Sequence, residues 1–126
     1  ERVKNLTGTF GAIISNGGGD GQVILTIEPT DKALNTNDCG DWFPLASHQG
    51  IKGPRLPGDG IFAVGPDVRP GTYRASKPKG CYWERLSNFE GTFEGIIANG
   101  NQSVVQILPS DTGFSTNDCG EWTKIG

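Results

Sequence analysis

Apolar and polar residues alternate along this chain in short runs, and clusters of Gly, Pro, Asn and Asp interrupt the runs about every 8–12 residues, a spacing typical of sandwiches and barrels. No window shows the i, i+3, i+4, i+7 spacing of an amphipathic helix, so we expect no helix longer than a turn. In the second half of the chain the pattern predicts strands at residues 60–65, 71–76, 81–87, 91–98, 102–108, 112–116 and 120–125. The expected fold class is all-β.

Turn residues separate these predicted strands. The segment Asp67–Gly71 is expected to turn between the first two strands, and Asn99-Gly100 is expected to close a hairpin between residues 91–98 and 102–108. Asn16-Gly17 is the same device earlier in the chain. Pro29 and Pro109 are expected to end strands, because proline cannot donate a ladder hydrogen bond.

The chain contains an internal repeat. Residues 1–16 are identical to residues 84–99 at nine of sixteen positions, and residues 31–42 are identical to residues 111–122 at seven of twelve. The change in alignment offset falls in the glycine-rich segment 17–21, as expected for a loop of variable length. The order and length of the matches predict two related units in tandem.

The repeat predicts the domain organisation. Residues 1–42 form a first unit, residues 43–57 a linker rich in proline and glycine, and residues 58–126 a second, complete unit. The first unit has no counterpart to residues 58–83, so it is expected to lack its opening hairpin. We expect two small antiparallel β-sandwich or barrel-like units. Their predicted cores consist of Phe93, Ile97, Val105, Ile107, Phe114 and Trp122 in the second unit, and of Phe10, Ile14, Ile24, Ile27, Leu34 and Trp42 in the first.

Composition narrows the class of protein. The formal net charge is -3 among 126 residues, which argues against a nucleic-acid-binding protein because such proteins usually have a basic face. No apolar run approaches the roughly 18 residues of a membrane span, and no signal peptide or anchor is recognisable in the sequence. With 20 Gly and 8 Pro the hydrophobic core is expected to be thin.

The three cysteines suggest an oxidising compartment. Cys81 and Cys119 lie 38 residues apart in the second unit, and a disulfide between them would stabilise a small domain by roughly 4 kcal/mol. Cys39 is the counterpart of Cys119, and its partner would align just before Glu1. Two alternatives are a Cys39–Cys81 bridge and a reactive thiol at Cys39, which the neighbouring acids Asp38 and Asp41 disfavour.

Several segments of the second unit resemble a known family. They are residues 64–74, 80–86, 96–100 and 116–124, with the sequences VGPDVRPGTYR, GCYWERL, IIANG and TNDCGEWTK. This set resembles a small disulfide-containing domain of exported proteins and lipoproteins in actinobacteria and related Gram-positive bacteria. The resemblance covers residues 59–126 fully and residues 1–42 without the opening hairpin. It implies an extracellular or cell-surface location, a Cys81–Cys119 disulfide and no established activity, so no catalytic residue is carried over.

Candidate catalytic and metal-binding groups are sparse. Glu84, Glu90 and Glu94 lie on or near predicted strands and offer carboxylates for a glycosidase pair, although solvated strand faces explain them better. A Ser-His-Asp mechanism would require His48, which lies in the predicted linker outside both units. Asp20, Asp38 and Asp41 are oxygen donors that suit calcium, but Asx turns account for the Asn-Asp pairs. We expect no catalytic residue, metal or cofactor.

An aromatic surface is the best candidate for binding. Tyr73, Tyr82 and Trp83 are the candidates for a platform that binds sugar or protein, with core packing near the disulfide as the favoured interpretation for Trp83. The sequence thus favours a non-catalytic extracellular β module with a protein or glycan partner. The alternatives are an assembly subunit completed by strands from a neighbouring chain or segment, including through self-association, and a small two-carboxylate hydrolase.

Overall fold

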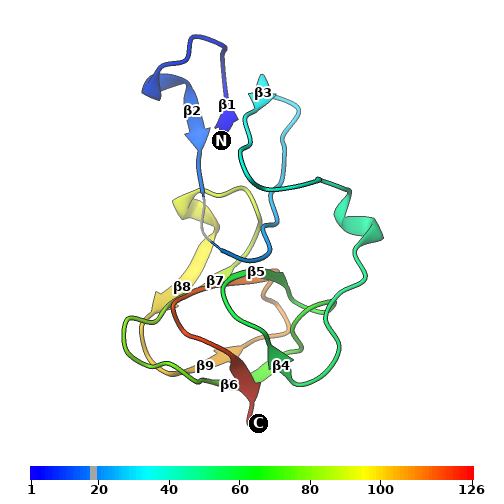
Figure 1. Cartoon of the computed structure of the whole chain (residues 1–126), viewed down its shortest axis with the longest axis vertical. Coiled ribbons are helices and arrows are strands. Elements are labelled where there is room, and N and C mark those ends of the chain that lie inside the picture. The colour runs from blue at the N-terminus through cyan, green and yellow to red at the C-terminus, as the bar shows by residue number, and fades with distance from the viewer. Residues whose placement is uncertain (18–19) are drawn as a thin grey trace.

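Short strands build the chain, and the helices among its described residues are three-residue 3-10 turns, as the sequence pattern predicts. The computed structural model describes residues 1–17 and 20–126. Its strands form three antiparallel sheets, one in the first half of the chain and two in the second half (Figure 1). The all-β prediction, with a sandwich or barrel-like arrangement, is confirmed.

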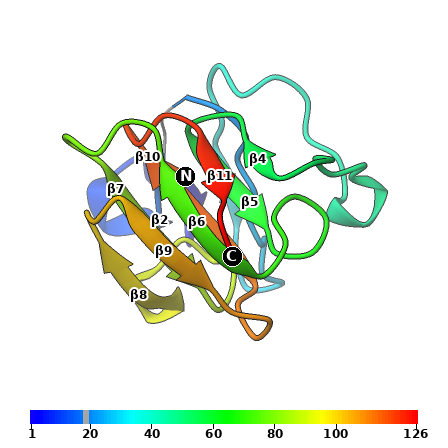
Figure 2. The same ribbon diagram turned by 90° about the horizontal axis from the view of Figure 1, so that it is seen from below.

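The second half consists of two four-stranded sheets. The first has the order β5 (Gly60–Ala63), β10 (Gly113–Asn117), β7 (Tyr82–Leu86) and β8 (Ile96–Gly100). The second has the order β4 (Arg55–Leu56), β11 (Trp122–Lys124), β6 (Gly71–Ala75) and β9 (Val104–Ile107), and its strands lie side by side in Figure 2. Sequential strands alternate between the two sheets except β7 and β8, which pair with each other in one sheet.

The core lies between these two sheets. Phe114 and Trp122 meet edge to face with ring centroids 5.4 Å apart, and the buried indole of Trp122 donates a 2.8 Å hydrogen bond to Thr116 Oγ1. The predicted core residues Val105, Ile107, Phe114 and Trp122 are all buried. The prediction is wrong for Phe93 and Ile97, which are exposed, because Phe93 starts the 3-10 turn η3 (Phe93–Gly95) at the surface and Ile97 lies in β8 at the edge of its sheet.

The first half contains one small sheet in the order β2 (Ile13–Ser15), β1 (Arg2–Val3) and β3 (Ala33–Leu34), with the 3-10 turn η1 (Phe10–Ala12) before β2. By the sequence alignment these strands correspond to β8, β7 and β10, which have the same order. The described part of the first half has no second sheet. Its predicted core is therefore not closed: Phe10, Ile27 and Trp42 are exposed, and Ile14, Ile24 and Leu34 are only partly buried.

One buried ion pair occurs at equivalent positions in both halves. Arg2 donates from Nε and Nη2 to the two carboxylate oxygens of Asp31 at 2.6 and 2.8 Å, and Arg85 does the same to Asp111 at 2.7 and 2.9 Å. Each aspartate also accepts a backbone N–H three residues earlier in the chain. Both arginines and both aspartates are identical positions of the repeat, so the repeated sequence encodes a repeated local geometry.

The Asn-Asp-Cys-Gly turns are also alike. Asp38 has φ 56° and Asp118 has φ 58°, the left-handed conformation that Asp tolerates better than most residues. In each half a tryptophan donates its indole N–H to the hydroxyl of the threonine six residues before it. Trp42 bonds Thr36 at 3.1 Å, and Trp122 bonds Thr116 at 2.8 Å. Local sequence therefore sets these turns even where no core forms around them.

Two turn predictions need correction. Asn99 and Gly100 do not form a hairpin turn but belong to β8, where they pair with Glu84 and Trp83. The strands β8 and β9 lie in different sheets, so the chain crosses between them instead of folding back. The predicted strand over 91–98 begins only at Ile96. Pro109 follows the end of β9 as expected, whereas residues 23–28 form no strand that Pro29 could end. Asn16-Gly17 follows β2, but the next described strand is β3, which does not pair with β2, so the expected hairpin is not formed among the described residues.

The predicted linker is not a free connection. It contains the 3-10 turn η2 (Leu45–Ser47), and its residues 55–56 form β4, which pairs with β11. Leu56 is part of the buried core, and Ile51 donates its N–H to the carbonyl of Pro66. The end of the linker is thus a core strand that the proline- and glycine-rich composition concealed.

Candidate functional site

The predicted aromatic platform does not form at the surface. Tyr73 is buried and donates its hydroxyl to the carbonyl of Arg69, and burial raises its pKa. Trp83 is buried, donates its indole N–H to Gln102 and stacks on Phe114. Both side chains point into the core because alternate residues of β6 and β7 face the opposite sheet. Only Tyr82 remains exposed, so the platform prediction is wrong for two of its three members.

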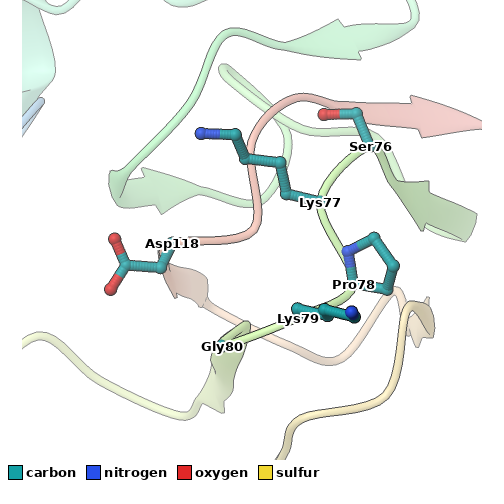
Figure 3. Close-up of a pocket in the computed structure, with 6 residues that line it drawn as sticks. All are labelled: Ser76, Lys77, Pro78, Lys79, Gly80 and Asp118. Carbon is teal, nitrogen blue, oxygen red and sulfur yellow. The ribbon is translucent and has the colours of Figure 1, made fainter.

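The disulfide joins Cys81 to Cys119, as the family resemblance implies. Beside it lies an open depression of about 680 Å³ lined by Ser76, Lys77, Pro78, Lys79, Gly80 and Asp118. All six residues are exposed, and their side chains do not converge on one point (Figure 3). The depression therefore lacks the enclosed walls and convergent polar groups of a small-molecule site.

His48 has an unexpected partner in the buried carboxylate of Asp67. His48 Nε2 lies 2.7 Å from Asp67 Oδ1, and Asp67 Oδ2 accepts hydrogen bonds from Gln22 Nε2 and from the N–H of Ala63. The expectation that His48 lies apart from both units is wrong, because the linker folds back onto the second half. Among the described residues no hydroxyl or thiol is hydrogen-bonded to His48, and its contact with Asp67 connects the linker to the second half.

The three glutamates that could offer a glycosidase pair, Glu84, Glu90 and Glu94, have separate surroundings. Glu84 accepts a hydrogen bond from the hydroxyl of Tyr82, and Glu94 is exposed on η3. Glu90 instead meets Glu28 of the first half, and the hydrogen bond between them raises the pKa of Glu28. Arg2 lies beside this pair and donates from Nη1 to the carbonyl of Glu90 at 2.6 Å. The sequence gives no signal for Glu28, because no local residue pattern relates a residue of the first half to one of the second half.

The two Arg–Asp ion pairs predict how the stability of the fold depends on pH. The hydrogen bond from Arg2 lowers the pKa of Asp31, so that pair stabilises the fold above the ordinary aspartate pKa and its contribution is lost as pH falls below about 4. Burial alone would raise the pKa of Asp111, but the hydrogen bonds from Arg85 and from the N–H of Leu108 outweigh it and lower the pKa. Both pairs therefore oppose acid unfolding.

The contribution of Glu28 to stability changes with pH in the opposite direction, because its pKa is raised in the folded protein. Its contribution is complete below the ordinary glutamate pKa and is lost as pH rises through the raised value. We therefore expect the melting temperature of Glu28→Gln, relative to that of the unaltered protein, to increase between pH 4 and pH 7. Glu94→Gln serves as an exposed control with no such trend. A constant difference across this range would show that Glu28 and Glu90 do not interact in solution.

Candidate metal ligands remain apart. Asp20, Asp38 and Asp41 are exposed, and the described residues contain no group of three or more His, Cys, Asp or Glu side chains placed to hold a metal ion. Cys39 is exposed and free, and its thiol lies 3.3 Å from the carbonyl of Asn37. No helix among the described residues has the length and apolarity needed to cross a membrane.

Two phenylalanines are the most exposed large apolar side chains of the described residues. Phe10 and Phe93 are 93% and 89% exposed. They occupy equivalent positions of the repeat, each follows a Gly-Thr pair, and each starts a 3-10 turn. The sequence signal for Phe10 and Phe93 is that the same aromatic residue occurs at matched positions of both units. That signal predicts core residues, and the prediction is wrong for both.

Comparisons with known proteins place the chain in a family. Residues 1–43 and 54–123 match the Rv1352-like extracellular domain. The chain is also similar to Rv1352 of Mycobacterium tuberculosis and to Mb1387 of Mycobacterium bovis, each named an uncharacterized protein. Each is 35% identical over 91 residues, which covers 58% of this chain and 73% of the relative. No solved structure matches the chain significantly. The chain therefore belongs to the Rv1352-like extracellular domain family.

Proposed function

We propose that this extracellular domain is a non-catalytic module that binds a protein partner through the two exposed phenylalanines. The observation that carries the proposal is the near-complete exposure of Phe10 and Phe93 at equivalent positions. Exposed aromatic side chains are costly to hydrate and are typical centres of protein interfaces. Their occurrence in both halves favours selection for a surface role over accidental exposure.

A protein partner is favoured over a glycan. Sugar platforms need aromatic faces combined with polar groups, and the burial of Tyr73 and Trp83 removes two of the three candidate rings. Phe10 and Phe93 carry no hydrogen-bonding atoms in their side chains. An apolar pocket on a protein is the surface that such side chains complement best.

We also infer that the chain presents two copies of one unit. The repeated Arg–Asp pairs, the repeated Trp–Thr hydrogen bonds and the paired phenylalanines all support this interpretation. Two equivalent contact points on one chain would let it bind a multivalent surface by avidity, because the second contact forms at a high effective concentration.

Photo-crosslinking tests the proposal. A benzoylphenylalanine placed at position 10 or 93 is expected to crosslink the same cell-envelope protein of the producing organism, whereas the same probe at the exposed Lys79 is not. Phe10→Ser and Phe93→Ser should each weaken binding about tenfold, and the double variant should weaken it further. The melting temperature should not fall, since neither side chain is packed.

The competing hydrolase hypothesis is tested in parallel. Turnover of any glycoside or ester that Glu28→Gln or Glu90→Gln abolishes would contradict the non-catalytic proposal. Crosslinking that is equal at positions 93 and 79 would contradict the role of the phenylalanines.

A further inference from the structure

The first half of the chain lacks the partners that complete the second half. In the second half β10 pairs on one side with β7 and on the other with β5. Its counterpart β3 pairs only with β1 among the described residues, so its outer edge is open. Open strand edges accept an added strand.

A hollow beside this edge corresponds to a filled position in the second half. It has a volume of about 390 Å³, and Val3, Leu6, Ile13 and Ala33 are among its lining residues. By the repeat alignment, the first three correspond to Leu86, Phe89 and Ile96. Those three belong to a packed cluster whose further members are Ala63 and Ile61 of β5 and Ile24.

The missing partner explains the state of Leu6. Phe89 is buried over Gly113, where an added Cβ would collide with the Phe89 ring, so the smaller Leu6 accompanies Ala33 in the first half. Leu6 is 75% exposed beside Ala33, which occupies the position of Gly113. A strand with apolar residues at the positions of Ile61 and Ala63 would cover Leu6 and fill the hollow.

Cys39 lies in the same incomplete unit. Its counterpart Cys119 is fully buried and bonded to Cys81, which follows β5 and β6 in the chain. Cys39 is exposed and free. In the second half, residues 54–81 supply the strand that pairs with β10, the apolar side chains of the packed cluster and the cysteine bonded to Cys119. The first half has no equivalent of these three among its described residues.

We propose that the first half binds a donor strand segment with the pattern of residues 54–81, supplied from outside these 126 residues. Its β5-like strand pairs with β3, its apolar residues enter the hollow, and its cysteine forms a disulfide with Cys39. Residues 54–81 of this chain are not the donor, because Leu56, Phe62, Tyr73 and Cys81 are already buried in their own unit. Phe10 also lines the hollow, whereas Phe93 does not, so variants of Phe93 test the proposed protein contact separately from the donor strand.

The disulfide step is an oxidation that needs an acceptor. The thiols of Cys39 and of the donor lose two protons and two electrons together as the S–S bond forms. A disulfide oxidant such as oxidised glutathione accepts them and becomes two molecules of reduced glutathione. Strand docking precedes this step and raises the effective concentration of the donor thiol.

A peptide of residues 54–81 provides the test. In a glutathione redox buffer we expect it to form a mixed disulfide at Cys39 of the full chain, at least about tenfold faster than a scrambled peptide with its cysteine at the same position. The peptide with Cys81→Ser should still protect Cys39 from alkylation. Equal rates for native and scrambled peptides would overturn the proposal.

Matched variants separate docking from thiol reactivity. Ala33→Asp, which places a charge in the hollow, should reduce the rate about tenfold, whereas Lys32→Asp on the same exposed segment and Phe93→Ser should leave it unchanged. If Ala33→Asp fails to fold, Ile61→Asp in the peptide tests the same contact without altering the chain. A Cys39-linked dimer of the chain alone would overturn the assignment of the donor to a segment outside it.

Discussion

Replacing Cys81 and Cys119 together by serine is expected to lower the free energy of unfolding by about 4 kcal/mol. The disulfide closes a loop with a sequence separation of 38 residues, so its loss increases the conformational entropy of the unfolded chain. Both sulfurs are buried, and each serine would place a hydroxyl in the core. A loss of this size is a large fraction of the stability of a domain this small.

Cys39→Ser is the matched control. Cys39 lies in the same type of turn as Cys119 but is exposed and free, so its replacement should change the free energy of unfolding by less than about 0.5 kcal/mol. Urea unfolding followed by circular dichroism measures both variants. Equal effects at Cys39 and at the Cys81–Cys119 pair would show that Cys39 is bonded or packed in solution.

Trp122→Ala is expected to destabilise the protein by about 3–5 kcal/mol. Trp122 is fully buried, packs on Phe114, and its indole N–H bonds Thr116. Its removal leaves a large cavity between the two sheets and an unpaired threonine hydroxyl.

The equivalent residue Trp42 makes the same type of hydrogen bond to Thr36 but is 39% exposed. Because no second sheet covers it, Trp42→Ala should cost less than about 1 kcal/mol. Chemical unfolding of both variants gives the comparison. Similar losses at positions 42 and 122 would mean that the first half has a closed core in solution.

Much of the second half could be predicted because its signals are local. Alternation identifies β6 and β9, since one face of each strand contacts the core and the other faces solvent, whereas β10 is buried along four of its five residues. The strand β4 was missed because two residues are too few to alternate and a proline stands on each side. Leu56 was the only signal of its core position.

The candidate site was less predictable because the exposure of a side chain depends on whether a second sheet covers it. Phe10 and Phe93 are identical in both units, and a shared aromatic residue suits either a core or an interface. Arg2–Asp31 and Arg85–Asp111 were detectable in principle as opposite charges that are identical between the units. The contacts of Glu28 with Glu90 and of His48 with Asp67 join segments far apart in the chain, which no local pattern specifies.

By itself the sequence determined the all-β class, the two alike Asn-Asp-Cys-Gly turns and, through its family resemblance, the second-half disulfide. These features depend on the period of side chains along a strand, on turn geometry and on cysteine positions. Only the tertiary structure decided that β8 and β9 belong to different sheets, that Tyr73 and Trp83 are buried, and that His48 of the predicted linker meets Asp67. The physical reason is that burial depends on which sheet covers which face, and two units with the same local sequence differ when only one of them has a covering sheet.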